Sequence, residues 1–181
     1  ERDWAAHVTI LSGEIGAAGM ADNTNNVIVN NDVNSTAVLD GFQVSFGSGM
    51  SGGLTFGGGM FNFFNASPTV RNCTFSSNHA TYGGAVYNFS NCFPTFTNCA
   101  FIGNQAVFLG AFHSSTSVAT LTNCSFSGNL GESVVFGDFA QILKNCIIWG
   151  NGAPSIAGLA TITHSIVQQP SGIYPGTGNL N

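Results

Sequence analysis

Apolar and polar residues alternate with a period of two along much of this 181-residue chain, in short runs separated by Gly, Asn and Ser. The segment Pro94-Thr95-Phe96-Thr97-Asn98-Cys99 is an example. Alternation in runs rich in Val, Ile, Phe and Thr predicts short β-strands rather than helices. Leucine-rich repeats have a similar period, but they need leucines at fixed offsets and a helical stretch, and the sequence has neither. The pattern therefore predicts an all-β chain.

The alternating pattern repeats around four cysteines that share one local context, Asn-Cys-x-apolar. The cysteines are spaced by 26, 25 and 22 residues, and each has an apolar residue three positions before it and another two positions after it. A Gly-rich apolar stretch recurs midway, at 57–62, 83–88 and 109–114. Such a period is typical of a solenoid, whose units bury their apolar faces only when they stack. The cysteines are Cys73, Cys99, Cys124 and Cys146.

The same register extends beyond the cysteines in both directions. Phe42 replaces the cysteine in 39–44 and Ser165 replaces it in 162–167, so the coils run 31, 26, 25, 22 and 19 residues and taper toward the C-terminus. Val8–Leu11 and Val27–Val29 predict strands of an earlier coil. At about 4.8 Å per coil, six to seven coils make a rod on the order of 30 Å long.

We expect one β-helix domain over residues 1–181, as a segment or processed form of a longer protein. Its last part, 168–181, reads as an irregular Pro/Gly-rich tail that could cover the last coil or reach a neighbouring molecule. No amphipathic capping helix is visible at either end. Uncapped coils expose backbone groups that can template further strands, which favours end-to-end stacking into a fibre.

The cysteines allow two interpretations. Residues stacked in register form a ladder of buried, reduced thiols, which we favour, although adjacent coils are close enough that a disulfide stays open. Cys92 falls outside the register and is the one candidate for an exposed or intermolecular thiol, the alternative being a loop thiol without a role. No histidine or second cysteine stands at zinc-ligand spacing, so we predict no metal site and no cofactor.

Two sets of asparagines recur with the cysteines, one residue before and five residues after each. Stacked asparagines can pair their side-chain amides with the copies above and below, so we predict structural ladders rather than ligand sites. The two ladders are Asn72, Asn98, Asn123 and Asn145, and Asn78, Asn104, Asn129 and Asn151.

Composition points to a surface that contacts something. Only 6% of residues are charged, against about 25% in an ordinary domain. With 16 Phe, some apolar area is expected to face outward, which usually marks a contact surface. The net charge is −5 with three basic residues, which excludes nucleic acid and anionic membranes as partners, and no apolar run is long enough for membrane insertion. Candidate interface residues are Phe61, Phe63, Phe64, Tyr87 and Trp149.

The acidic residues offer no catalytic arrangement. β-Helix lyases and hydrolases need clustered carboxylates on one face. The eight here never occupy equivalent positions in successive coils, although Asp22 with Asp32, or Glu132 with Asp138, could meet through loops. We therefore predict no catalytic residues and no enzyme activity. Paired threonines, at 95/97, 120/122 and 161/163, give ice binding as a minor alternative, interrupted by Arg71, Ile142 and Lys144.

Several segments resemble a known group of proteins. These are 9–16, 37–42, Gly57-Gly58-Gly59-Met60 and 67–76, which contains Ser-Pro-Thr and Asn-Cys-Thr-Phe. They look like bacterial secreted right-handed parallel β-helix proteins, similar in repeat style to the polymorphic outer-membrane autotransporters of chlamydiae. The resemblance implies a right-handed parallel β-helix that is secreted or displayed at the cell surface. Such proteins act as adhesins, surface-layer or fibre components, while other β-helices process polysaccharides.

The expected function is therefore structural or adhesive, as an extracellular rod or a fibre subunit. The expected partners are further copies of the chain or other surface components, with glycans possible. A carbohydrate-binding or carbohydrate-processing β-helix is the alternative.

Overall fold

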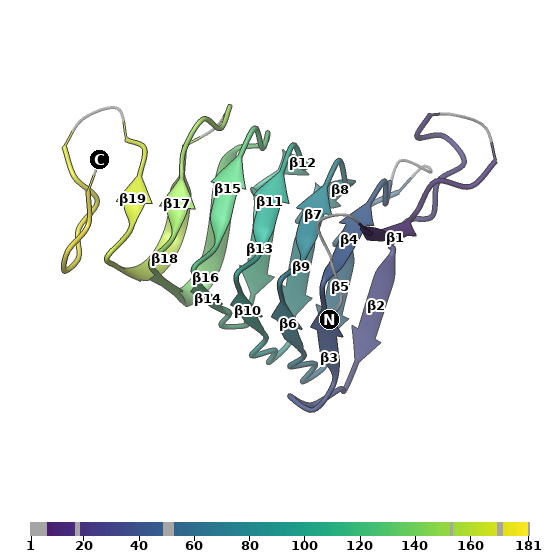
Figure 1. Ribbon diagram of the computed structural model, residues 1–181, viewed down its shortest axis with the longest axis horizontal. Helices are drawn as coiled ribbons and strands as arrows, with labels where there is room; N and C mark the ends of the chain where they lie inside the picture. The colour runs from purple at the N-terminus through teal and green to yellow at the C-terminus, as the bar shows by residue number, and fades with distance from the viewer. Residues whose placement is uncertain (1–6, 17–18, 49–52, 153, 170–171, 181) are drawn as a thin grey trace.

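The computed structural model describes residues 7–16, 19–48, 53–152, 154–169 and 172–180, and these residues form strands and turns. Within these ranges no helix is long and apolar enough to cross a membrane. The strands wind into coils, and each coil stacks in parallel on the one before (Figure 1). The chain is thus a parallel β-helix, with its first coils purple and its last coils yellow in the figure.

One seven-stranded parallel sheet runs the length of the stack and carries the residues that follow each cysteine. Its successive register pairs are 33, 31, 26, 25, 22 and 19 residues apart, so the taper predicted from the sequence is present. The strands are β1 (Thr9–Ser12), β4 (Phe42–Ser45), β7 (Thr74–Ser76), β11 (Ala100–Ile102), β15 (Ser125–Ser127), β17 (Ile147–Ile148) and β19 (Ile166–Val167).

A ten-stranded sheet consists of two columns that merge toward the C-terminal end. The first column is β2 (Ile28–Asn31), β5 (Met60–Phe63), β9 (Val86–Phe89) and β13 (Gly110–Ser115). The second is β3 (Val38–Asp40), β6 (Thr69–Arg71), β10 (Thr95–Thr97) and β14 (Thr120–Thr122). Both columns pair with the long β16 (Ser133–Lys144), which pairs with β18 (Ile156–Thr163). The last coils are shorter because β16 spans both columns without a turn between them, and the pairing of β16 with β18 has an irregularity between Gly137 and Gln141.

A two-stranded sheet, β8 (His79–Tyr82) with β12 (Gln105–Phe108), fills the third side of the middle coils. The core lies inside the coils and consists of three stacked columns of apolar side chains. In one of them the rings of Phe75, Phe101 and Phe126 stack, with centroids 5.3 and 4.5 Å apart. The three columns are Val44/Phe75/Phe101/Phe126/Ile148/Val167, Val70/Phe96/Leu121/Leu143/Ile162 and Met60/Val86/Phe112/Val135.

The four repeat cysteines occupy equivalent buried positions and are free thiols. Each Sγ lies near two carbonyls, one two residues earlier and one in the preceding coil, as at Cys99 with Thr97 (3.4 Å) and Val70 (3.7 Å). Burial raises the pKa of Cys73, which keeps its thiol protonated. The four cysteines therefore form a buried, stacked ladder.

Of the two interpretations of Cys92, the structure excludes the exposed thiol. Its side chain is fully buried and free, and its N–H donates to the Ser117 hydroxyl of the next coil (3.0 Å). Ala66, Cys92 and Ser117 are spaced by 26 and 25 residues and are all buried, so Cys92 has a register of its own in the turn after β9. The turn directs the Cys92 side chain inward, whereas a residue in a loop is usually expected to be exposed.

Both predicted asparagine ladders form, but in different environments. The members of the first ladder take positive φ at the turn before each cysteine and pair through exposed amides, as Asn98 Nδ2 donates to Asn72 Oδ1 (3.2 Å). The second ladder lies inside the coils. There Asn104 Nδ2 donates to the Phe75 carbonyl (2.9 Å), and its Oδ1 accepts the backbone N–H of Asn78 (3.1 Å).

A third polar ladder was not anticipated. Asn30 donates to Asn62 (2.7 Å), Asn62 to Asn88 (2.7 Å) and Asn88 to the hydroxyl of Ser114 (3.0 Å). Three of these side chains, Asn62, Asn88 and Ser114, are fully buried on the inward face of β5, β9 and β13. The column was detectable from the sequence, because Asn62 and Asn88 occupy the same place after the Gly-rich stretch.

The described part of the tail, 168–169 and 172–180, covers the last coil. The Leu180 N–H donates to the Ser165 carbonyl (2.8 Å), and Asn179 Oδ1 accepts the Ser165 N–H (3.1 Å). Tyr174 packs against the core. In the structure the tail covers the last coil, which is the first of the two arrangements considered above. It lies over the C-terminal half of β18 and over β19.

Candidate functional site

The outward side of β5, β9, β13 and the first half of β16 carries a grid of aromatic rings, which we term the aromatic face. Successive coils bring these side chains into line because the strands are in register. The face has three columns: Phe56/Tyr82/Phe108, Phe61/Tyr87/His113/Phe136 and Phe63/Phe89/Ser115/Asp138. Phe64, directly after β5, adds a ring at the margin.

The Gly-rich stretch explains why the first column lies on the second. Gly57 and Gly83 take positive φ, which glycine adopts without strain. A Cβ on Gly57 would lie 2.3 Å from the Met60 carbonyl oxygen, and one on Gly83 would lie 2.4 Å from that of Val86. The turn is therefore tight enough to fold the aromatic residue before it back onto the strand after it.

The rings contact one another across coils. Phe56 lies 5.5 Å from Tyr82 and 5.0 Å from Tyr87, measured between centroids. Tyr87 meets the imidazole of His113 edge-on at 4.7 Å, and His113 meets Phe136 at 5.0 Å. Such pairs add about 0.5–1.5 kcal/mol each beyond area burial. The face is therefore a rigid aromatic surface rather than a set of independent side chains.

The middle of the aromatic face is covered and its margins are open to solvent. Tyr87 and His113 are 7% and 3% exposed, whereas Phe64, Phe89 and Phe108 are 53%, 39% and 44% exposed. A hollow of about 140 Å³ lies between four rings, those of Phe56, Phe61, Tyr87 and Phe89. Concave apolar sites of this kind are the usual places where small groups bind.

One end of the aromatic face is polar. The Ser115 hydroxyl donates to the Asp138 carboxylate (2.8 Å). Burial raises the pKa of Tyr87, so its phenol stays protonated. Burial also lowers the pKa of His113 to about 4, against a smaller opposing effect of Asp138. His113 is therefore neutral near pH 7, and Asp138 is the carboxylate that borders this end.

Four of the five candidate interface residues gather on this face, and the fifth does not. Phe61, Phe63, Phe64 and Tyr87 lie together, with Tyr87 buried beneath its neighbours. Trp149 is 47% exposed but follows β17 on the seven-stranded sheet. The sequence interpretation missed the column of Phe56, Tyr82 and Phe108, although their regular spacing before the Gly-rich stretch signals it.

The paired threonines lie in line on β10, β14 and β18, as the repeat predicts. Thr95 is in register with Thr120, and Thr97 with Thr122. The array is interrupted by the next coils in both directions, where Arg71 pairs with Asp40 (Nε to Oδ2, 3.0 Å) and Ile142 and Lys144 replace the threonines. A regular two-column array therefore spans only two adjacent coils.

Carboxylates stay scattered among the residues that the structure describes. Glu132 accepts the N–H of Leu109 (3.0 Å), and Asp40 pairs with Arg71. Among these residues no group of three His, Cys, Asp or Glu side chains is arranged to hold a metal ion. Glu1 and Asp3 lie outside the described ranges.

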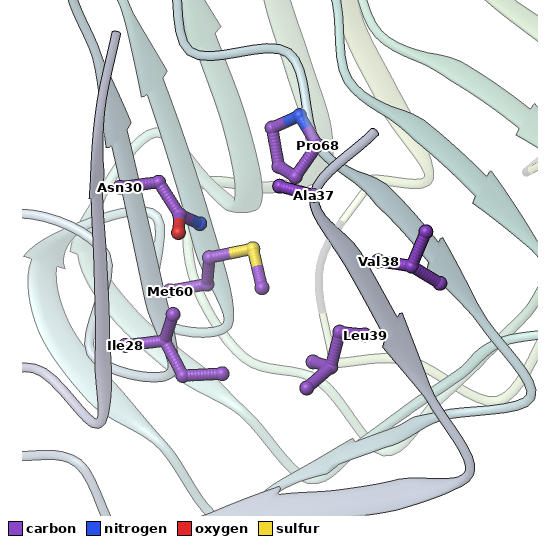
Figure 2. Close-up of a pocket in the computed structure, with 7 residues that line it drawn as sticks. All are labelled: Ile28, Asn30, Ala37, Val38, Leu39, Met60 and Pro68. Atoms are coloured by element: carbon purple, nitrogen blue, oxygen red, sulfur yellow. The ribbon is translucent and has the colours of Figure 1, made fainter. Parts of the chain in front are cut away.

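A second hollow opens at the N-terminal end of the stack. It measures about 140 Å³ and lies between β2 and β3. Figure 2 shows Ile28, Met60 and Leu39 directed toward this space, while Val38 points away from it. Ile28 and Leu39 are only partly buried against the core. Among the residues that the structure describes, the apolar interior of the coil is thus accessible at this end, whereas the tail covers the last coil.

Comparison with known proteins identifies one family. A family model described as "Right handed beta helix region" matches residues 7–169, which is most of the chain. No curated protein and no solved structure matches the chain. The match confirms the expected fold class, an all-β right-handed parallel β-helix solenoid.

Proposed function

Because the chain belongs to the right-handed β-helix family, whose fold serves enzymes and structural proteins alike, we propose that it is a structural and adhesive rod that makes contact through its aromatic face. The rod is secreted or displayed at a cell surface. One observation carries this proposal, the continuous grid of aromatic rings in the three columns of the aromatic face.

Large aromatic side chains dominate the energetics of protein contacts, because they bury much area and lose little conformational freedom. Here three of them, Phe64, Phe89 and Phe108, are 39–53% exposed around a rigid centre. The scarcity of charge across the chain removes the usual barrier to association. A solenoid holds such a face flat and at a fixed distance from its attachment point, which suits adhesion.

The test displays the chain on a non-adherent bacterium and measures attachment to epithelial cells, insoluble polysaccharide and an abiotic surface. We expect attachment above that of the empty display system, and a return to that level when Phe64, Phe89 and Phe108 are replaced by serine. Ile102 and Ile147 are 45% and 49% exposed on the other sheet, so their replacement by serine is the matched control. Unchanged attachment by the aromatic variant, or equal losses in both variants, would contradict the proposal.

End-to-end assembly into a fibre is the second candidate, and the open N-terminal hollow favours it. Val29 is 56% exposed on β2, the edge strand of its sheet at that end. A lysine on an edge strand opposes pairing with another chain. Val29→Lys should therefore reduce any concentration-dependent light scattering, whereas Val107→Lys, at a site 50% exposed in the middle of the stack, should not. A strictly monodisperse monomer at high concentration would exclude the fibre.

Carbohydrate binding remains the alternative partner for the aromatic face. Attachment to the insoluble polysaccharide that soluble oligosaccharide competes away would favour it over general adhesion. Turnover of that oligosaccharide would refute the prediction, made from the sequence, that the chain has no enzyme activity.

A further inference from the structure

We propose that the hollow between Phe56, Phe61, Tyr87 and Phe89 is a binding site for an alkylated ammonium group, such as a trimethylammonium head. This inference rests on the proposal that the aromatic face is a contact surface, and it names the chemistry that the face recognises. The ligand group is an organic cation of any larger molecule that presents it.

The size of the hollow suits a compact apolar group. It measures about 140 Å³. An engineered apolar cavity of about 150 Å³ accommodates benzene. A trimethylammonium head is of comparable size and has a rounded surface of methyl groups, so it can touch several rings at once.

The walls of the hollow favour a cation over a neutral polar group. Three of its four rings are phenylalanines, which offer no hydrogen bond. The remaining ring, that of Tyr87, is only 7% exposed, so the hollow offers a ligand little polar surface. A sugar in this hollow would leave hydroxyl groups unpaired, which is costly, whereas a quaternary ammonium has no hydrogen bond to satisfy. The negative faces of aromatic rings attract such a cation directly.

The charges around the aromatic face have the matching sign. Asp138 lies in the same outward column as Phe89, two coils further along, and is exposed. The chain carries a net charge of −5. Of its three basic residues, Arg71 pairs with Asp40 and Lys144 lies on the other column of the sheet, while Arg2 is outside the described residues. No described Lys or Arg therefore competes for these rings.

The test compares choline with 3,3-dimethylbutan-1-ol, its neutral isostere, by calorimetric titration of the purified full chain. Since cation–π attraction supplies the difference, we expect choline to bind about two- to thirtyfold more tightly than the isostere. Equal affinities for the two compounds would overturn the proposal, because they would show an apolar hollow without preference for charge. Saturable binding of a methyl glycoside without binding of choline would also overturn it.

Two substitutions locate the site. Phe89→Leu keeps apolar volume but removes a ring face, and Asp138→Asn removes the charge without changing shape. We expect both to weaken choline binding, the second most strongly at low ionic strength. Phe93→Leu, at a site 52% exposed that does not line the hollow, is the control and should leave binding unchanged. Equal effects of Phe89→Leu and Phe93→Leu would overturn the assignment.

The outcomes separate this inference from the proposed function. If the displayed chain adheres through the aromatic face but choline does not bind, the adhesive function stands and the cation site is wrong. If attachment does not depend on the aromatic face, the function itself fails, whatever choline does. Thermal unfolding of each variant checks that it is folded, so that a loss of binding reports the substitution and not misfolding.

Discussion

Replacing Asn104 by alanine should be among the most damaging single changes to the stability of this chain. Asn104 is fully buried, and its side chain makes four hydrogen bonds within the coils. Alanine would leave the Asn78 backbone N–H and one Asn78 amide hydrogen without an acceptor, and the Phe75 carbonyl would lose a donor. Because each orphaned buried polar group costs about 1–3 kcal/mol, the three together cost about 3–9 kcal/mol.

The matched control is Asn98→Gly in the exposed ladder. It also removes a stacked amide, but water can replace the lost bonds there, and glycine keeps the positive φ of this turn. The chain itself uses Gly41 at the equivalent position. We expect a loss of about 1 kcal/mol or less for the control.

Thermal unfolding followed by circular dichroism measures both variants. In a chain of this size 1 kcal/mol shifts Tm by about 2–4 °C, so Asn104→Ala should lower Tm on the order of 10 °C and Asn98→Gly by a few degrees at most. Similar losses in the two variants would refute the reasoning, because they would show that burial does not decide the contribution of a stacked amide.

Three further predictions concern thiols, pH and surface charge. The five thiols should resist a thiol reagent in the native chain and react fully in guanidinium, since all are buried; rapid native labelling of one thiol would contradict this. Burial lowers the pKa of His113 to about 4 from its ordinary 6.5, so the unfolded chain binds a proton in that window that the folded chain does not. Stability is then complete above pH 6.5 and falls by about 3 kcal/mol as the pH drops to 4, and His113→Phe should flatten Tm against pH over that range. Arg71→Thr breaks an exposed ion pair worth about 1 kcal/mol or less, so Tm should change by no more than about 4 °C. Thermal hysteresis that increased in the Arg71→Thr variant would favour ice binding.

The repeat made most of the architecture predictable from the sequence. Equivalent positions in a stacked solenoid share one environment, so the cysteine register alone assigned the inward columns, both asparagine ladders and the taper. The burial of Cys92 was not predicted because its column is formed by Ala66 and Ser117, residues with no chemical similarity to a thiol. Register, rather than residue type, carries the information there.

The aromatic face was only partly predictable. Phe61, Phe63, Phe64 and Tyr87 were recognised as outward candidates, whereas Phe56 and Tyr82, which directly precede the Gly-rich stretch, were not. Whether a turn folds its preceding residue onto the strand depends on backbone close approach, here at Gly57 and Gly83. Asp138 borders the aromatic face because the first half of β16 pairs with β13. Sequence spacing alone does not predict this pairing.

The unequal length of the coils has a consequence for folding fidelity. Uniform repeats can slip by one unit and still satisfy the same contacts, which is how repeat arrays misassemble. In this chain the register steps are 33, 31, 26, 25, 22 and 19 residues, so a coil that docked one place out of order would leave a surplus or a shortage of residues to be accommodated. Each coil therefore fits at only one position in the stack, and the taper disfavours docking of the coils in the wrong order.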